Sequence, residues 1–143
     1  MIKVGVLSDI HGNMEALKAV LEDVDFWGIK RLLILGDIAL MGAEPDKTIN
    51  YVKNLSQKYD VDIIQGNTDL FIVNDGLPPI PEFAKNSVIY AKENVSDENK
   101  LYLKLLPPQK SITIGNTSVL MVHGSPRKNI SRSEERFSRN AET

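Results

Sequence analysis

The residues best suited to chemistry in this sequence are carboxylates, amides and imidazoles that follow short apolar runs. The sequence contains no cysteine, so any metal ligands must be oxygen atoms or imidazole nitrogens. Such ligands suit Mn²⁺, Fe²⁺, Zn²⁺ or Mg²⁺. Two such cations that share a carboxylate can hold a phosphate and activate water for in-line attack. The candidates are Asp9, His11, Asp37, Asn67, Asp69 and His123.

The elements that must position these candidates are strands that alternate with helices. Strands are predicted at 2–7, 32–35 and 61–64, and helices at 14–24 and 45–55. This alternating order is typical of a parallel sheet. Ligand sites in such sheets lie beyond the carboxyl ends of the strands. We therefore expect Asp9, Asp37 and Asn67 to meet at one edge.

The second half of the chain predicts two helices and a hairpin. The helices are expected at about 83–95 and 97–106, and the strands at 111–114 and 117–122. Asn13 and Ser96 are the predicted N-caps of the first and last helices. The dipeptide Gly115-Asn116 is a two-residue hairpin signal. His123 directly follows the second hairpin strand and can therefore join the predicted site.

Length and composition limit the classes of protein to consider. A chain of 143 residues is about one domain, which we place at residues 1–126. Residues 127–143 hold three hydrophobic residues and predict a mobile polar tail. The net charge of -2 gives no basis for bulk binding to nucleic acid or to an anionic membrane. The sequence shows neither a signal peptide nor an apolar run of ~20 residues, so we expect a cytoplasmic protein.

Four motifs carry the candidate residues. They read Asp9-Ile10-His11-Gly12-Asn13, Gly36-Asp37-Ile38-Ala39-Leu40-Met41-Gly42, Gly66-Asn67-Thr68-Asp69 and Val122-His123-Gly124-Ser125-Pro126-Arg127. In this order they resemble the motifs of the calcineurin-like metallophosphoesterases, and most of all those of the small prokaryotic phosphodiesterase branch. The resemblance covers residues 1 to about 127. It implies an α/β fold, a four-layer α/β/β/α sandwich of two mixed sheets faced by helices.

The resemblance also implies a role for each site residue. Asp9 and His11 resemble ligands of a first metal, Asn67 and His123 resemble ligands of a second, and Asp37 resembles the carboxylate that bridges both. The implied reaction is hydrolysis of a phosphodiester or phosphomonoester by water that the two metals activate. The expected cofactors are two divalent cations, Mn²⁺ first, with Fe²⁺, Zn²⁺, Ni²⁺ and Mg²⁺ as alternatives. Asp37 and Asn67 are accordingly catalytic candidates.

The sequence departs from the family pattern at two places. Thr68 stands where the family often has a histidine, and threonine is a poor general acid. Asp69 or solvent would have to protonate the leaving group, which makes Asp69 a third catalytic candidate. The family also ends with a Gly-His-x-His motif, whereas this sequence has no histidine after His123. We therefore expect missing C-terminal strands, impaired turnover, and self-association through an uncovered sheet edge.

Two classes of function remain open. A metal-dependent phosphoesterase acting on a small phosphoester is favoured because all five predicted metal ligands occur together. A non-catalytic binding module, or an inactive fragment with the same fold, is favoured by the missing histidines. A haloacid-dehalogenase phosphatase would need a second aspartate in place of His11. A response-regulator receiver would need a phosphoacceptor aspartate in place of Asn67.

Overall fold

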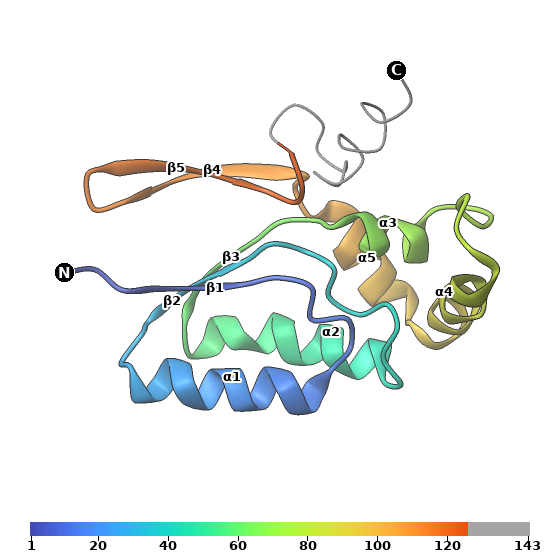
Figure 1. Cartoon of the computed structure of the whole chain (residues 1–143), viewed down its shortest axis with the longest axis horizontal. Helices are drawn as coiled ribbons and strands as arrows, with labels where there is room; N and C mark the ends of the chain where they lie inside the picture. The colour runs from blue at the N-terminus through green and yellow to red at the C-terminus, as the bar shows by residue number, and fades with distance from the viewer. Residues whose placement is uncertain (126–143) are drawn as a thin grey trace, which may run out of the picture.

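Two stacked β-sheets form the centre of the structure, a computed structural model that describes residues 1–125. The predicted polar tail lies outside these residues. The first sheet is parallel and has the order β1 (Val4–Leu7), β2 (Arg31–Ile34), β3 (Asp60–Ile63). The second is an antiparallel hairpin of β4 (Gln109–Ile114) and β5 (Thr117–Val122). The hairpin lies over one face of the parallel sheet (Figure 1).

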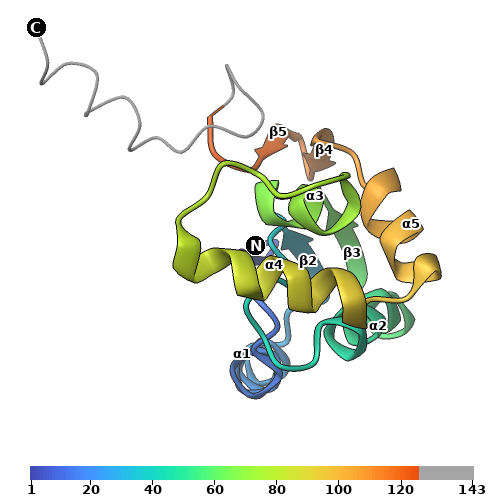
Figure 2. The same cartoon turned by 90° about the vertical axis from the view of Figure 1, so that its right-hand side faces the viewer.

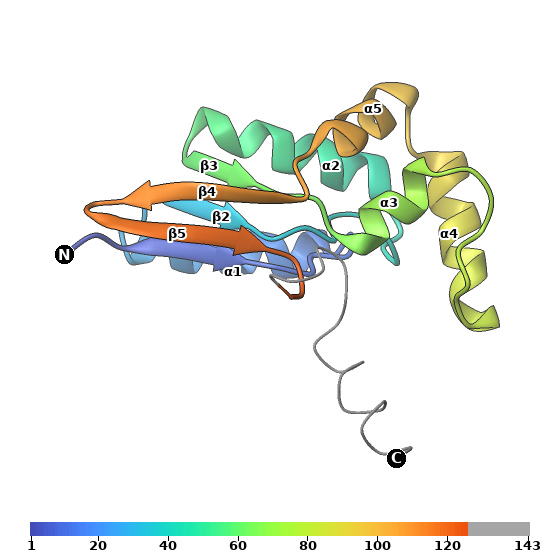
Figure 3. The same cartoon turned by 90° about the horizontal axis from the view of Figure 1, so that it is seen from above.

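Helices cover the other face and one end of the parallel sheet. The face is covered by α1 (Met14–Phe26) and α2 (Pro45–Asn54), and a short 3-10 turn, η1 (Leu55–Gln57), follows α2. At the carboxyl end of the strands stand α3 (Asn67–Val73), α4 (Glu82–Asn94) and α5 (Asp97–Leu105) (Figures 1 and 3). Within residues 1–125, none of these helices has the length and hydropathy that a bilayer span requires.

The sequence predicts most of these elements and their caps. Asn13 accepts a hydrogen bond from the backbone N–H of Ala16, and Ser96 accepts one from that of Asn99, as expected for N-caps. The sequence does not predict the helix α3, because its seven residues, Asn67–Val73, are too few to show a helical periodicity. Residues 1–125 thus supply a mixed α/β fold with helix, sheet and hairpin layers.

The continuous apolar runs of the parallel strands are explained by burial on both faces. Leu32 and Ile34 are fully buried in the core beneath α1 and α2. Leu33, between them on β2, belongs to a second cluster with Ile112 and Met121 of the hairpin. Successive side chains of a strand point to opposite faces, so one strand contributes to both clusters. The hairpin is therefore held by apolar packing against β2.

Polar contacts also tie the hairpin to the parallel sheet. The buried carboxylate of Asp62 on β3 lies 2.8 Å from Arg31 Nη2 and 2.6 Å from Lys110 Nζ. Arg31 Nη1 also donates to the backbone carbonyl of Thr113 at 3.0 Å. Burial acts to raise the pKa of Asp62, but the hydrogen bonds from Lys110 and Arg31 outweigh it and hold that pKa below its usual value.

The loops that follow the strands approach one another very closely at glycines. A methyl group at position 66 would lie 2.1 Å from Asp37 Oδ1 and 2.3 Å from the Asp37 backbone nitrogen. A methyl group at position 42 would lie 2.4 Å from the Cα atom of Gly12. Only glycine fits at such distances, so the packing of these loops depends on their glycines.

Replacing Asp62 should produce a pH-dependent loss of stability. Because the folded pKa is below the unfolded value, the stabilisation is present above pH ~4 and is lost as the pH falls through the folded pKa. Asp62→Asn should cost about 1 kcal/mol of unfolding free energy at pH 7, since half-exposed Lys110 is screened by solvent. Urea unfolding at pH 7 and pH 3 measures this. Asp60→Asn, at a 71% exposed side chain, is the control and should change little. An equal loss at both pH values would contradict this account.

Adding a methyl group at Gly66 should disrupt the loop packing. Because the neighbouring atoms belong to the backbone and a buried carboxylate, Gly66→Ala should cost at least about 2 kcal/mol by overpacking. Gly28→Ala is the control for an uncrowded position, since no neighbour lies within 4 Å of the added methyl group; its φ is +66°, whereas that of Gly66 is -96°. It should cost only the left-handed backbone strain, about 1 kcal/mol. Thermal unfolding measures the loss of stability in both variants. Equal losses would contradict the close packing assigned to Gly66.

Candidate metal centre

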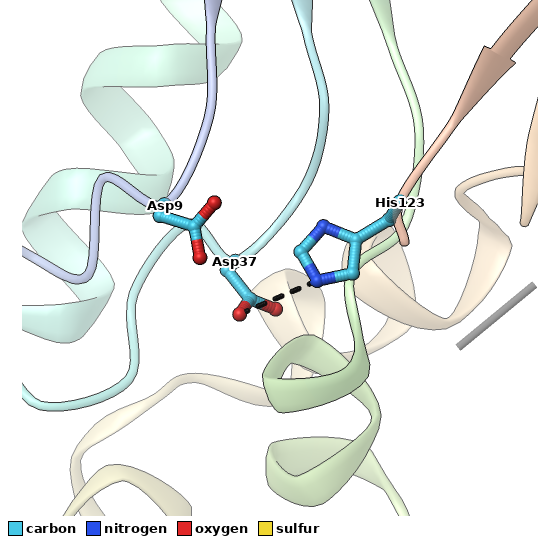
Figure 4. A group of neighbouring side chains, drawn as sticks. All are labelled: Asp9, Asp37 and His123. Carbon is cyan, nitrogen blue, oxygen red and sulfur yellow. Dashed lines mark ion pairs between the residues drawn. The ribbon is translucent and has the colours of Figure 1, made fainter. Parts of the chain in front are cut away.

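The predicted site residues meet at the carboxyl end of the parallel sheet. Asp9 and His11 follow β1, Asp37 follows β2, Asn67 begins α3 after β3, and His123 follows β5. Ligand atoms of Asp9, Asp37 and His123 lie within 4.8 Å of one another (Figure 4). Side chains distant in the sequence therefore share one site, as the strand order predicts.

The backbone is strained at the residues that follow β1 and β2. Asp9, His11 and Asp37 have φ values of +56°, +49° and +57°, which are uncommon outside glycine. The two loops are held together by hydrogen bonds from the His11 N–H to the Asp37 carbonyl at 2.9 Å and from the Gly12 N–H to the Ile38 carbonyl at 2.8 Å. Such strain persists only where the surroundings enforce it, and it concentrates at functional sites.

The two carboxylate oxygens of Asp37 have different surroundings. Oδ1 accepts a hydrogen bond from the backbone N–H of Thr68 at 2.9 Å. Oδ2 lies 3.7 Å from His11 Nε2 and 3.5 Å from His123 Nε2. The side chain is almost fully buried, so this orientation is fixed by packing. One oxygen of Asp37 thus faces both imidazoles, which is the arrangement that a bridging ligand requires.

Both histidines are oriented by backbone carbonyls. The Nδ1 atom of His11 lies 3.2 Å from the Leu40 carbonyl, and that of His123 lies 2.6 Å from the Leu35 carbonyl. A carbonyl only accepts, so each Nδ1 carries the proton and Nε2 presents a lone pair in the neutral ring. A second hydrogen bond of this kind is the usual companion of a metal-ligating histidine.

The remaining donors complete two sets around Asp37. Asp9 Oδ1 lies 3.5 Å from His11 Nε2, and Asp9 is itself more than half exposed and accepts a hydrogen bond from the Ser8 hydroxyl. Asn67 Oδ1 lies 3.0 Å from His123 Nε2. When the His123 ring is neutral, Asn67 Oδ1 and His123 Nε2 are both acceptors. A cation bound by both atoms would stabilise this arrangement. The oxygen and imidazole donors gathered here, with Asp9, Asp37 and His123 within 4.8 Å of one another, therefore suit a divalent cation.

Asp69 lies beneath the site rather than in it. Its carboxylate has no exposed surface and accepts hydrogen bonds from the backbone N–H groups of Asp37, Ile38 and Gly66 at 2.8–2.9 Å. Burial raises the pKa of Asp69 to about 6, although these N–H groups act in the opposite direction. The sequence makes Asp69 a catalytic candidate, whereas this geometry favours a positioning role.

Sequence reasoning missed the groups that orient the ligands. They are the carbonyls of Leu35 and Leu40 and the N–H of Thr68, all of which belong to the backbone. Every residue carries a backbone carbonyl and every residue except proline an N–H, so residue identity gives no indication of their use. For Asp69 an indication existed, because an acidic residue three positions after a helix cap commonly bonds back to the cap N–H.

Comparison with known proteins adds independent support for the family. Residues 2–143 match the calcineurin-like phosphoesterase superfamily domain. The chain is 31% identical over 125 residues to an uncharacterised protein of Methanocaldococcus jannaschii. The matched residues are 87% of this chain and 50% of the relative.

Two solved structures are also similar. A hypothetical protein of Pyrococcus horikoshii OT3 has a TM-score of 0.86 and 29% identity, covering 92% of this chain and 58% of that one. A metallophosphoesterase of Sphaerobacter thermophilus has a TM-score of 0.68 and 28% identity, covering 90% of this chain and 49% of that one. The chain thus spans about half the length of these relatives. On the match over nearly its whole length, this chain belongs to the calcineurin-like phosphoesterase superfamily.

Proposed function

We propose that the protein is a metal-dependent phosphoesterase that hydrolyses a small phosphodiester or phosphomonoester with two divalent cations, Mn²⁺ being the first candidate. The observation that carries this proposal is the position of Asp37 Oδ2, within 3.7 Å of two Nε2 atoms that each have their lone pair free. When bound, the cations would supply positive charge that attracts the phosphate, and they would lower the pKa of a bound water molecule.

The protein's own residues would divide between the two cations. Asp9, His11 and Asp37 would hold the first, and Asp37, Asn67 and His123 would hold the second. Two carboxylates neutralise only half of the charge of two divalent cations, so the loaded site would attract an anionic phosphoester. Asp9 and His11 are the more exposed ligands, which leaves this side of the site accessible to substrate.

The proton for the leaving group would come from solvent. The Thr68 hydroxyl is buried and has no hydrogen-bond partner among residues 1–125, and both Asp69 oxygens are engaged by backbone N–H groups. Neither side chain presents a proton donor at the surface of the site. Asp69 would instead hold Asp37 and Asn67 in place, because it joins the loops that carry them.

Replacing the bridging carboxylate should remove metal binding most completely. Asp37→Asn keeps an oxygen for the Thr68 N–H but removes the charge that both cations share. Loss of an outer partner alone costs 10–100-fold in metal affinity, so we expect Mn²⁺ affinity to fall by at least about 100-fold. Titration calorimetry with Mn²⁺ measures this affinity. Hydrolysis of an aryl phosphodiester should disappear in Asp37→Asn, and it should also disappear in the parent protein when a chelator is added.

The matched control is Asp23→Asn, at an exposed carboxylate of α1. It should bind Mn²⁺ as the parent does. Unchanged Mn²⁺ affinity in Asp37→Asn would contradict the metal site itself. Tight Mn²⁺ binding without turnover of any phosphoester would favour the non-catalytic binding module.

Asp69→Asn distinguishes a positioning residue from a general acid. The amide presents a donor where Asp69 now accepts N–H groups, so the loops should shift and Mn²⁺ affinity should fall about tenfold. The shape of the pH–rate profile should stay the same. A general acid would behave in the opposite way, with unchanged Mn²⁺ affinity and loss of the alkaline limb of the profile. Calorimetry and rates from pH 5 to 9 decide between the two.

A further inference from the structure

A depression of about 340 Å³ lies between α4 and the loop that follows β2. Its lining comes from Met41, Gly42 and Ala43 on the loop and from Asn86, Ser87 and Tyr90 on the helix. Figure 2 shows α4 crossing the end of the molecule at which the parallel strands terminate. The volume is within the range of small-molecule sites, about 300–1,000 Å³. The depression therefore stands at the same end of the fold as the metal centre.

The loop that lines this depression also orients a metal ligand. The Leu40 carbonyl, directly before Met41, accepts a hydrogen bond from His11 Nδ1. The next residues pack against the same segment, since a methyl group at Gly42 would lie 2.4 Å from the Cα atom of Gly12. Chain connectivity and packing thus place the depression beside His11, the more solvent-exposed histidine of the site.

Met41 is held in a strained conformation that exposes its side chain. Its φ is +79°, in the left-handed region, and 53% of the residue is exposed. The strained backbone belongs to the tight loop that packs against Gly12, and it leaves the Met41 side chain exposed. The thioether is polarizable and adapts its shape to apolar ligands. Met41 is therefore available for contact with a ligand in the depression.

Tyr90 provides a rigid aromatic surface across from Met41. Its hydroxyl donates to the Ala43 carbonyl at 2.7 Å, which fixes the ring while 44% of the residue stays exposed. Phe83 and Ser87 lie seven and three residues before it, on the same face of α4. The opposite face is anchored in the core by buried Val88. The ring and its polar neighbours are therefore presented by a fixed helix.

We propose that this depression binds the nucleobase of a nucleotide substrate. Tyr90 and Met41 offer exposed apolar surfaces against which a planar base can stack, and the Asn86 amide, which also lines the depression, can donate to and accept from base edges. The proposal rests on the proposed function in one respect, that the phosphate of the same molecule reaches the metal centre. Recognition of the base itself needs no metal.

The test uses adenosine as the probe, in EDTA, with the whole chain labelled at methionine methyl groups and at backbone and side-chain amides. Adenosine should shift the NMR signals of Met41, Gly42 and the Asn86 side chain, whereas ribose 5-phosphate should not. Tyr90→Ala should weaken adenosine binding about tenfold, since stacking contributes strongly for each base. Tyr90→Phe keeps the ring and should retain most of the affinity.

Phe26→Ala removes an 80% exposed aromatic at the far end of α1 and serves as the control. It should leave adenosine binding unchanged. Equal binding of ribose 5-phosphate, shifts confined to other surfaces, or full affinity in Tyr90→Ala would each overturn the nucleobase site. Failure of Mn²⁺ binding in the calorimetric experiment would overturn the proposed function alone, because adenosine binding in EDTA does not depend on it.

Discussion

The hydrogen bonds accepted by the buried carboxylate of Asp69 are the interaction on which the geometry of the candidate metal centre depends. Three backbone N–H groups, those of Asp37, Ile38 and Gly66, converge on it from the loops that follow β2 and β3. Buried N–H groups without acceptors are costly, and no regular sheet pairing is available to them beyond the strand ends. The Asp69 carboxylate accepts the hydrogen bonds that a neighbouring strand would otherwise accept, and it thereby fixes the spacing between the two loops.

Burial of this charge has a consequence for the site above it. The pKa of Asp69 is raised to about 6 by burial, with a further contribution from the negative charge of Asp37. Two carboxylates held this close would repel each other in the absence of positive charge. A cation on the outer oxygen of Asp37 would offset that repulsion, so loop geometry and cation binding would stabilise each other. The strained backbone at Asp9, His11 and Asp37 is held by the same set of loops.

The sequence predicts the parts of the site that residue type determines. Asp9, Asp37 and Asn67 were placed at one edge because parallel strands end together, and the structure brings these loops together as expected. Helix α3 escaped prediction because a seven-residue helix carries too short a periodicity to recognise. The inward orientation of His123 depends on the Leu35 carbonyl, 88 residues away in the sequence. A contact between residues so far apart in the sequence can be predicted only when the packing of the hairpin over β2 is known.

The structure separates the parts of the molecule that hold chemistry from those that can vary. The candidate metal ligands lie at strand ends, where glycines, backbone hydrogen bonds and Asp69 allow little change. The helix α4 packs on the core through its buried residues Val88 and Ala91, so its exposed residues can change without disturbing the strand ends. A superfamily with one site chemistry can acquire different substrates in this way. Met41 joins the two parts, because its strained backbone continues the loop that orients His11 while its side chain extends toward α4.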